Sequence, residues 1–225
     1  KRLTNAAPNA LVAAVYGSTE AEPIAHLYAA EIGEADLEAM QRGEGLLAGE
    51  PVPEISLAIV PNTWGTPIEP MSGDEFEDMQ LKEDLPGEIV VSGDHVLTGY
   101  LDGVGDEETK FRVGETIWHR TGDAGRLDAQ GRVWLLGRAG AVTRDDRGEL
   151  YPFAVETALS FDNSLTRSAL LLHENQRLLF IEGKLSVDVS WAQIDKIIPA
   201  SRIPVDKRHN AKIDYPALRK LAERS

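Results

Sequence analysis

The sequence predicts an α+β fold in two parts. Strand-like alternation with closely spaced turn residues dominates residues 45–137, whereas strands alternate with helices after residue 138. The chain has 225 residues, 42% of them hydrophobic and 27% charged, which is typical of a folded globular protein. We therefore expect a β-rich domain at 1–138 and a small α+β domain at 139–225, with the boundary near Gly137–Ala141.

The first part reads as strands interrupted by one helix. An apolar run at Asn9–Tyr16 predicts a buried strand that ends at Gly17. Apolar residues three positions apart, followed by a glycine, predict a helix at Glu34–Arg42. The acidic residues between Asp74 and Asp84 are expected in an exposed loop. Further strands are expected at Ile55–Val60, Ile89–Val91, Val96–Tyr100, Val113–Arg120 and Arg132–Leu136.

The second part alternates strands and helices. A proline at the first position predicts the start of a helix at Pro152–Leu159. An amphipathic pattern predicts a helix at Ser190–Ile198, with Ser190 as its N-cap, and a last helix at Pro216–Glu223. The expected strands are a hairpin of Val142–Arg144 with Glu149–Tyr151, and a pair formed by Ser168–Leu172 and Arg177–Glu182.

Charge is spread unevenly along the chain. The formal net charge is −14, but residues 196–225 hold eight Lys or Arg against three acids, so this tail carries +5 and the preceding residues carry −19. A surface this acidic binds nucleic acid and anionic membranes poorly, so we expect neither as a partner. The basic tail indicates an anionic ligand or, equally, a solvated helix end that complements the helix dipole.

Several kinds of site are excluded. With no cysteine, the chain has no disulfide, thiolate zinc site or cysteine nucleophile, and its histidines lack metal-ligand spacing. Residues 43–48 match the letters of a dinucleotide-binding turn but follow a helix instead of a strand. The chain contains neither a P-loop nor a serine-nucleophile elbow. Its apolar runs are shorter than the roughly 20 residues of a membrane span, and we expect a cytoplasmic protein.

The segment Tyr-Gly-Ser-Thr-Glu at residues 16–20 has the residue types of a nucleotide site. The ring of Tyr16 can stack on a base, and the hydroxyls of Ser18 and Thr19 can hold phosphate oxygens. The carboxylate of Glu20 can bind Mg²⁺, which prefers oxygen ligands. The alternative is an ordinary strand and turn.

Three later segments also carry candidate residues. Asp123 follows a Thr-Gly turn and can accept hydrogen bonds from a ribose diol, or can simply cap that turn. Arg138 immediately precedes the predicted domain boundary. Lys212 is expected in a loop between a strand and a helix, from which it can reach an anion.

Taken in order, these segments resemble the motifs of the adenylate-forming superfamily, which includes acyl-CoA synthetases, peptide-synthetase adenylation domains and luciferases. The chain is especially similar to fatty-acyl-type synthetases, above all the olefin β-lactone synthetases. The matching segments are YGSTE (16–20), GEIVVSG (87–93) with Gly99-Tyr100, RTGD (120–123), GR (137–138) with YPFAVE (151–156), and NAKID (210–214).

This resemblance implies an enzyme that joins a carboxylic acid to ATP with Mg²⁺, releasing pyrophosphate, and the subfamily likeness implies a fatty acid. Residues 1–138 would be the last β-rich subdomain of the large AMP-binding domain, and 139–225 the mobile lid domain. The implied nucleotide-binding residues are Tyr16, Gly17, Ser18, Thr19, Asp123 and Arg138; the implied catalytic residues are Lys212, Thr19 and Glu20, with Glu20 also the metal ligand.

The chain also departs from the family pattern. Gly140 stands where the family has a hinge Asp or Lys, and Arg144–Gly148 replaces an Arg-Gly turn, so CoA as the acceptor stays open. The family's phosphate loop lies upstream of the first motif, and this chain begins 15 residues before Tyr16. We expect it to need that upstream part and to be inactive alone. The alternatives are a β-lactone synthetase acting on a long-chain 3-hydroxy acid, a non-catalytic nucleotide- or partner-binding relative, and a β-rich oligomerisation domain.

Overall fold

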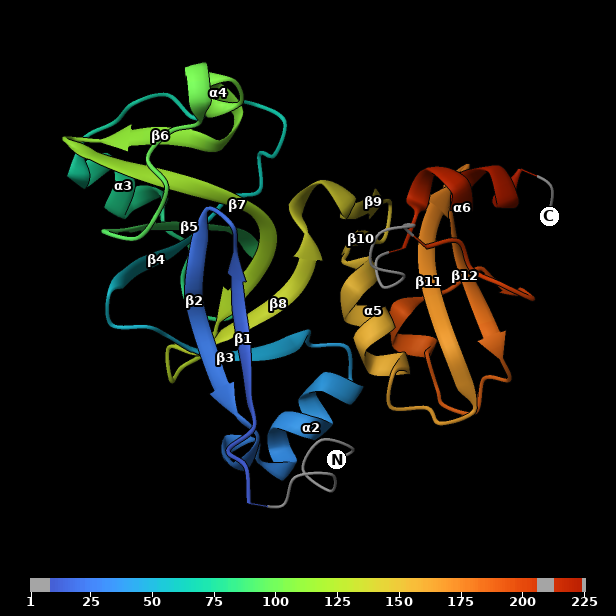
Figure 1. The fold of residues 1–225 in the computed structure, drawn as a ribbon. Helices are drawn as coiled ribbons and strands as arrows, with labels where there is room; N and C mark the ends of the chain where they lie inside the picture. Colours follow the sequence, from blue (N-terminus) through green and yellow to red (C-terminus); the bar gives the residue numbers. More distant parts are fainter. Residues whose placement is uncertain (1–8, 206–212, 224–225) are drawn as a thin grey trace. The chain divides into compact units, whose positions relative to one another are not determined.

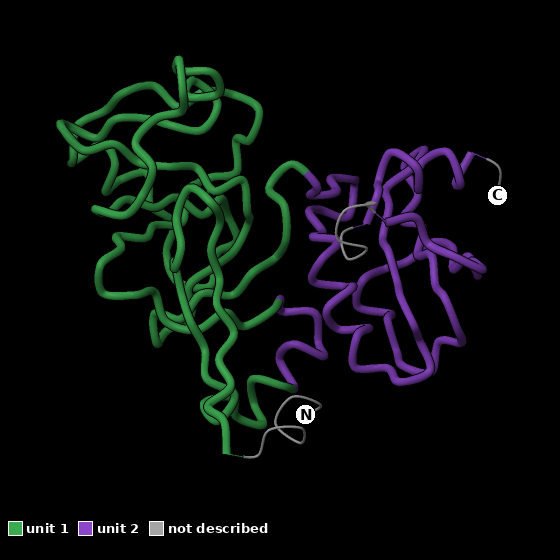
Figure 2. The backbone as a smooth tube through the Cα atoms, viewed as in Figure 1, with its two compact units in different colours: residues 1–37, 46–140 green, residues 38–45, 141–225 purple. Residues whose placement is uncertain are grey.

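The computed structural model describes residues 9–205 and 213–223, and these residues divide into two compact units (Figures 1 and 2). The first unit comprises 1–37 and 46–140, and the second comprises 38–45 and 141–225. The chain is therefore α+β, as the sequence predicts. The inclusion of 38–45 in the second unit is a finding that no sequence pattern indicated.

The first unit is built on one antiparallel sheet with the strand order β1-β2-β3-β8-β7-β5-β4, and β6 pairs with β7 (Figure 1). Both faces of β4 and β5 are buried, because alternate residues enter different apolar clusters. The strands are β1 (Ala13–Ser18), β2 (Ala21–Tyr28), β3 (Leu46–Pro51), β4 (Ile55–Val60), β5 (Gly87–Gly93), β6 (Lys110–Val113), β7 (Thr116–Leu127) and β8 (Val133–Arg138).

Short helices join these strands. The structure places α2 at Glu34–Gln41, α3 at Gly73–Met79 and α4 at Asp106–Thr109, and single 3₁₀ turns lie at Ala29–Glu31 and Leu101–Gly103. The helix α2 confirms the expected one, and β4 has the bounds that its alternation predicts.

The second unit places a three-stranded sheet between two helices. The strands β11 (Leu165–His173) and β12 (Gln176–Gly183) are antiparallel, and β13 (Lys196–Pro199) runs parallel to β12. The helix α5 (Pro152–Leu159) packs on one face of this sheet and α6 (Tyr215–Ala222) on the other, since alternate sheet residues join their two clusters. The expected hairpin is present as β9 (Thr143–Asp145) and β10 (Gly148–Leu150).

Several expectations were wrong. The strand expected to be buried at Asn9–Tyr16 is β1, which begins only at Ala13 and leaves Val15 exposed. The strand expected at Val113–Arg120 is divided by a turn between β6 and β7.

The acidic segment after Ser72 is partly helical, because Ser72 and Glu75 form a capping box and Phe76 is buried beneath α3. Residues 96–100 form no strand. The expected helix at 190–198 is a single 3₁₀ turn, Ser190–Ala192, followed by β13, and Ser190 is not its N-cap. Pairing with β12 outweighs helical periodicity there.

Candidate functional site

Three strands bring Tyr16, Asp123 and Arg138 together. The Tyr16 hydroxyl on β1 donates to Asp123 Oδ2 at 3.1 Å, and Arg138 Nη1 on β8 lies 3.2 Å from Asp123 Oδ1. Asp123 and Arg138 are direct cross-strand partners of β7 and β8. Tyr16 and Arg138, which are 107 and 15 positions from Asp123 in the chain, thus both contact its carboxylate. The three residues predicted to contact the base, the ribose and the phosphate therefore lie side by side.

The turn before Asp123 explains its orientation. The Thr121 hydroxyl donates to the Ile89 carbonyl at 2.9 Å and accepts the Asp123 backbone N–H at 3.0 Å. Gly122 has a φ of +72°, and a Cβ there would lie 3.0 Å from the Trp64 ring. Glycine therefore permits both the left-handed backbone and the close aromatic contact. The Asp123 side chain stays 21% exposed, so it can still meet a ligand.

Tyr16 is a fixed hydrogen-bond donor. Its side chain is buried, and burial together with the Asp123 charge raises the pKa of its phenol well above the ordinary value. The phenol therefore stays protonated at physiological pH. Gly17 follows, and a Cβ there would lie 2.9 Å from the Ala21 carbonyl oxygen, so glycine permits the close approach of β1 to β2.

Glu20 lies in the turn between β1 and β2, next to exposed Thr19 and half-buried Ser18. The Tyr100 hydroxyl donates to Glu20 Oε1 at 3.0 Å. Partial burial raises the pKa of Glu20, but hydrogen bonds from its own backbone N–H and from neighbouring hydroxyls outweigh burial, so the net pKa is lowered. An ionised carboxylate is the result.

The described residues contain no group of three or more His, Cys, Asp or Glu that could hold a metal. The single carboxylate of Glu20 nevertheless fits Mg²⁺, which is commonly bound through one or two carboxylates and the phosphates of a substrate. Glu20 would hold the ion, and the ion would supply positive charge to nucleotide phosphates.

Sequence analysis missed buried His119 and half-buried Lys110, which interact electrostatically with Glu20. His119 on β7 is only 2% exposed, and its Nδ1 is 2.9 Å from Lys110 Nζ. Burial, reinforced by the Lys110 charge, lowers the pKa of His119 to about 4, so the imidazole is neutral at pH 7. Lys110 Nζ also lies 5.2 Å from the centre of the Tyr100 ring. No sequence spacing connects these residues, because strand pairing of β6 with β7 brings them together.

Arg120 supports the site without facing a ligand. Its guanidinium donates to both carboxylate oxygens of Glu88 at 2.7 and 2.8 Å, and to the Thr66 carbonyl at 2.7 Å. Both side chains of the ion pair are fully buried. The Arg-Thr-Gly-Asp segment therefore combines a buried structural arginine with a partly exposed aspartate.

In the second unit, the segment that replaces the family's Arg-Gly turn forms an ion-pair network. The buried Asp145 carboxylate accepts two hydrogen bonds from Arg177, at 2.7 and 2.8 Å, and also pairs with Arg147. Arg147 also pairs with Asp195 at 2.8 Å. These arginines are thus occupied by carboxylates of the same unit.

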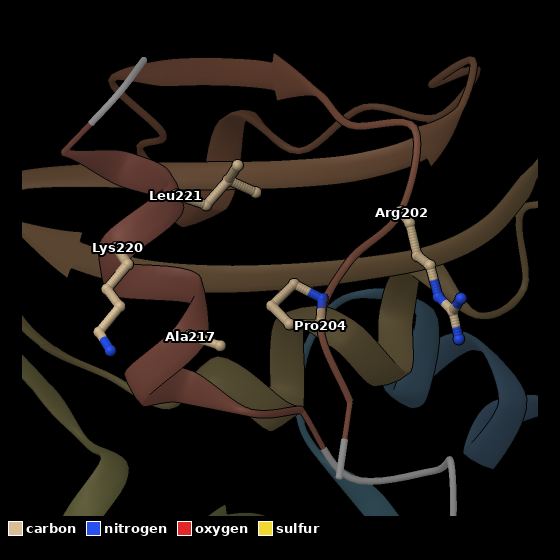
Figure 3. A pocket seen from close by; sticks show the side chains of 5 residues that line it. All are labelled: Arg202, Pro204, Ala217, Lys220 and Leu221. Atoms are coloured by element: carbon tan, nitrogen blue, oxygen red, sulfur yellow. The ribbon is translucent and has the colours of Figure 1, made fainter. Parts of the chain in front are cut away.

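Lys212 lies outside the described residues, so the structure gives no position for it. A shallow pocket of about 400 Å³ lies in the second unit, between the segment at 202–204 and α6 (Figure 3). Its walls come from Arg202, Pro204, Ala217, Lys220 and Leu221.

Known proteins with similar sequences are named as CoA ligases and synthetases. The chain is 31% identical over 163 residues to indoleacetate–CoA ligase of Aromatoleum aromaticum, an alignment that covers 72% of this chain and 27% of that protein. It is 27% identical to an olefin β-lactone synthetase of Xanthomonas campestris, covering 88% of this chain and 40% of the relative. No family model matches the chain.

Solved structures with a similar fold cover most of this chain. Apo MatB from Rhodopseudomonas palustris aligns with a TM-score of 0.68 at 19% identity, over 99% of this chain and 43% of that one. The amide bond synthetase McbA from Marinactinospora thermotolerans aligns with a TM-score of 0.66 at 18% identity, over 93% and 42%. At these identities the structural likeness shows the fold alone.

The chain is related to adenylate-forming enzymes. This confirms the resemblance that the five motifs predicted. The chain spans less than half the length of the relatives it matches. Among the described residues, no helix has the length and apolar character needed to cross a membrane.

Proposed function

We propose that this chain is the C-terminal part of an ATP-dependent acid ligase, active as part of a longer protein. Tyr16, Asp123 and Arg138 converge on one partly exposed carboxylate, and this convergence is the observation that carries the proposal. Related proteins are named as CoA ligases and synthetases, and each extends well beyond the segment that matches this chain. Residues 1–138 would contribute the last part of a large AMP-binding domain, and 139–225 a lid.

Different residues would contact the adenine, the ribose and the phosphates of the nucleotide. The Tyr16 ring would stack on the adenine, and Asp123 would accept hydrogen bonds from the ribose hydroxyls. A carboxylate has about four acceptor positions, so Asp123 can keep Tyr16 while it binds the ribose. Arg138, 60% exposed, would turn toward the ribose and phosphate side. Gly17 and Ser18 would lie beside the nucleotide, and Thr19 would contact the α-phosphate.

The reaction would be displacement at the α-phosphorus. An oxygen of the substrate carboxylate attacks that phosphorus, the bond to the bridging oxygen of the β-phosphate breaks, and pyrophosphate leaves with the electron pair. Glu20 would hold Mg²⁺. Lys212 would contact both the α-phosphate and the substrate carboxylate and stabilise the charge that develops at phosphorus.

The substrate and acceptor form the finer part of the proposal. We favour a fatty acid, because relatives include long-chain-fatty-acid–CoA ligases and olefin β-lactone synthetases. CoA would be one acceptor. The alternative, lactone formation from a 3-hydroxy acid, is supported by the olefin β-lactone synthetase relative, whose alignment covers 88% of this chain. The proposed setting is the cytoplasm.

Acid-dependent exchange of labelled pyrophosphate into ATP tests this proposal. The complete protein should catalyse exchange with at least one acid from a panel of fatty, 3-hydroxy fatty and aromatic acids. The Lys212→Ala variant should lose roughly 10²- to 10³-fold in exchange rate while it retains ATP binding. The 225-residue chain alone should show none. Equal exchange by wild type and Lys212→Ala would remove Lys212 from the mechanism, and robust exchange by the chain alone would refute the need for an upstream part.

A further inference from the structure

We propose that Tyr100 is a positioning residue for Glu20, holding its carboxylate in the orientation that binds the metal. This inference rests on the proposed function, because it assigns a second residue to the same metal site. The residue types alone do not suggest it, since Tyr100 lies 80 positions from Glu20.

The Tyr100 side chain contacts one of the two oxygens of the Glu20 carboxylate. The Tyr100 hydroxyl donates to Glu20 Oε1 at 3.0 Å and so fixes the position of one carboxylate oxygen. A fixed carboxylate suits Mg²⁺, which demands near-ideal octahedral geometry. Hydrogen-bonded partners of this kind commonly set the orientation of metal-binding side chains.

The backbone of Glu20 is held by the same loop. The Leu97 N–H donates to the Glu20 carbonyl oxygen at 2.7 Å, three residues before Tyr100. The Tyr100 N–H in turn donates to Asp106 Oδ1 at 2.8 Å. The loop at 97–100 therefore contacts Glu20 through both main chain and side chain, and Asp106 fixes the backbone of this loop at Tyr100.

Lys110 also contacts the loop at 97–100. Its ammonium group donates to the Leu97 carbonyl, lies 5.2 Å from the Tyr100 ring centre and lies 2.9 Å from His119 Nδ1. The Lys110 ammonium donates to His119 Nδ1, so an acceptor on a buried β-strand helps to fix the lysine. The chain of contacts runs from His119 through Lys110 to Leu97 and Tyr100, and ends at Glu20.

The test is the Tyr100→Phe variant of the complete protein, which removes only the hydroxyl. The readout is the affinity for Mn²⁺ in the presence of ATP, measured by electron paramagnetic resonance, a quantity that does not depend on turnover. We expect Mn²⁺ affinity to fall about 10-fold. ATP affinity without metal should be unchanged, and this second measurement reports that the variant is folded. Tyr28→Phe, at the far end of β2, is the matched control and should retain wild-type Mn²⁺ affinity.

A double-mutant cycle separates positioning from general loosening of the structure. If Tyr100 acts through Glu20, the variant Glu20→Gln/Tyr100→Phe should bind Mn²⁺ no more weakly than Glu20→Gln alone. Additive losses, or wild-type affinity in Tyr100→Phe, would overturn the inference while leaving the proposed function in place. Unchanged Mn²⁺ affinity in Glu20→Gln would overturn the inference together with the proposed role of Glu20 as the metal ligand.

Discussion

The Asp123 carboxylate contacts two other nucleotide-binding candidates of the first unit, Tyr16 and Arg138. Asp123 accepts the Tyr16 hydroxyl and pairs with Arg138, and its backbone N–H is held by Thr121. These contacts preset the carboxylate before any nucleotide is bound, which lowers the cost of ordering it on binding. Arg120, two residues before Gly122, is not exposed as Asp123 is, because its charge is wholly buried against Glu88.

The Glu88–Arg120 pair yields a prediction about stability. Glu88→Gln leaves the Arg120 guanidinium buried without a charged partner, and we expect a loss of about 3–5 kcal/mol in the free energy of unfolding. Asp84→Asn, which removes a 65%-exposed partner of Arg126, should cost less than about 1 kcal/mol. Urea denaturation of the two variants checks this, and similar losses would contradict the assignment of Glu88–Arg120 as a buried structural pair.

Much of the candidate site could be predicted at the residue scale. Tyr16, Asp123 and Arg138 lie in recognisable motifs, and the structure brings them together. The roles of these residues and of Lys212 remain predictions. Lys110 and His119 could not be found, because their contact depends on the register of β6 on β7, which no local pattern specifies.

Elements with strong local signals were predicted well, and elements fixed by tertiary pairing were not. The alternation of β4 and the proline of α5 are local, and both elements have the expected bounds. By contrast, β2 and β3 were missed; β2 carries a Pro and small residues, and β3 contains Gly49. Such residues are poor strand signals, so pairing with neighbouring strands decides the conformation.

Gly49 yields a prediction at the scale of the sheet. It has a φ of +94°, and a Cβ there would lie 2.1 Å from the His26 carbonyl oxygen on β2. Gly65 has the same φ, but a Cβ there would meet no atom within 4 Å. Gly65→Ala should therefore cost only backbone strain, about 1–2 kcal/mol, whereas Gly49→Ala should cost clearly more because β2 and β3 must separate. Equal losses in chemical denaturation would show that the close approach is unimportant.

Glu156 links α5 to the start of α6 and makes the second unit sensitive to pH. The Tyr215 hydroxyl donates to Glu156 Oε1 at 3.0 Å, and burial raises the pKa of Glu156 from 4.5 to about 7. The folded state therefore keeps a proton that the unfolded state releases between pH 4.5 and 7, so this contribution to stability is present below pH 4.5 and is lost as pH rises through 7.

The variant Glu156→Gln isolates that contribution, because a neutral amide mimics the protonated acid. Relative to Glu156→Gln, the wild type should lose up to about 3 kcal/mol in the free energy of unfolding of the second unit between pH 4.5 and 7.5. Denaturation curves across this range measure the difference. Curves that stay parallel would show that Glu156 has the same pKa in the folded and unfolded states and would contradict the prediction.

At the scale of the whole molecule, the chain consists of two units, each with its own core. The candidate nucleotide residues of the described chain belong to the first unit, and Lys212 belongs to the sequence of the second. The fold class could be predicted from the change in element pattern near residue 139. The grouping of residues 38–45 with the second unit could not, because Gly43 packs against the Trp191 ring, a contact between distant segments.

The affinity of the complete protein for ATP, with and without the Asp123 carboxylate, tests the central claim most directly. Calorimetric titration should give an ATP dissociation constant at least about 10-fold higher for Asp123→Ala than for the wild type, since two hydrogen bonds to a charged acceptor are lost. Asp84→Asn, which alters a carboxylate outside the site, should bind ATP as the wild type does. An unchanged dissociation constant in Asp123→Ala would contradict the assignment of Tyr16, Asp123 and Arg138 as a nucleotide site.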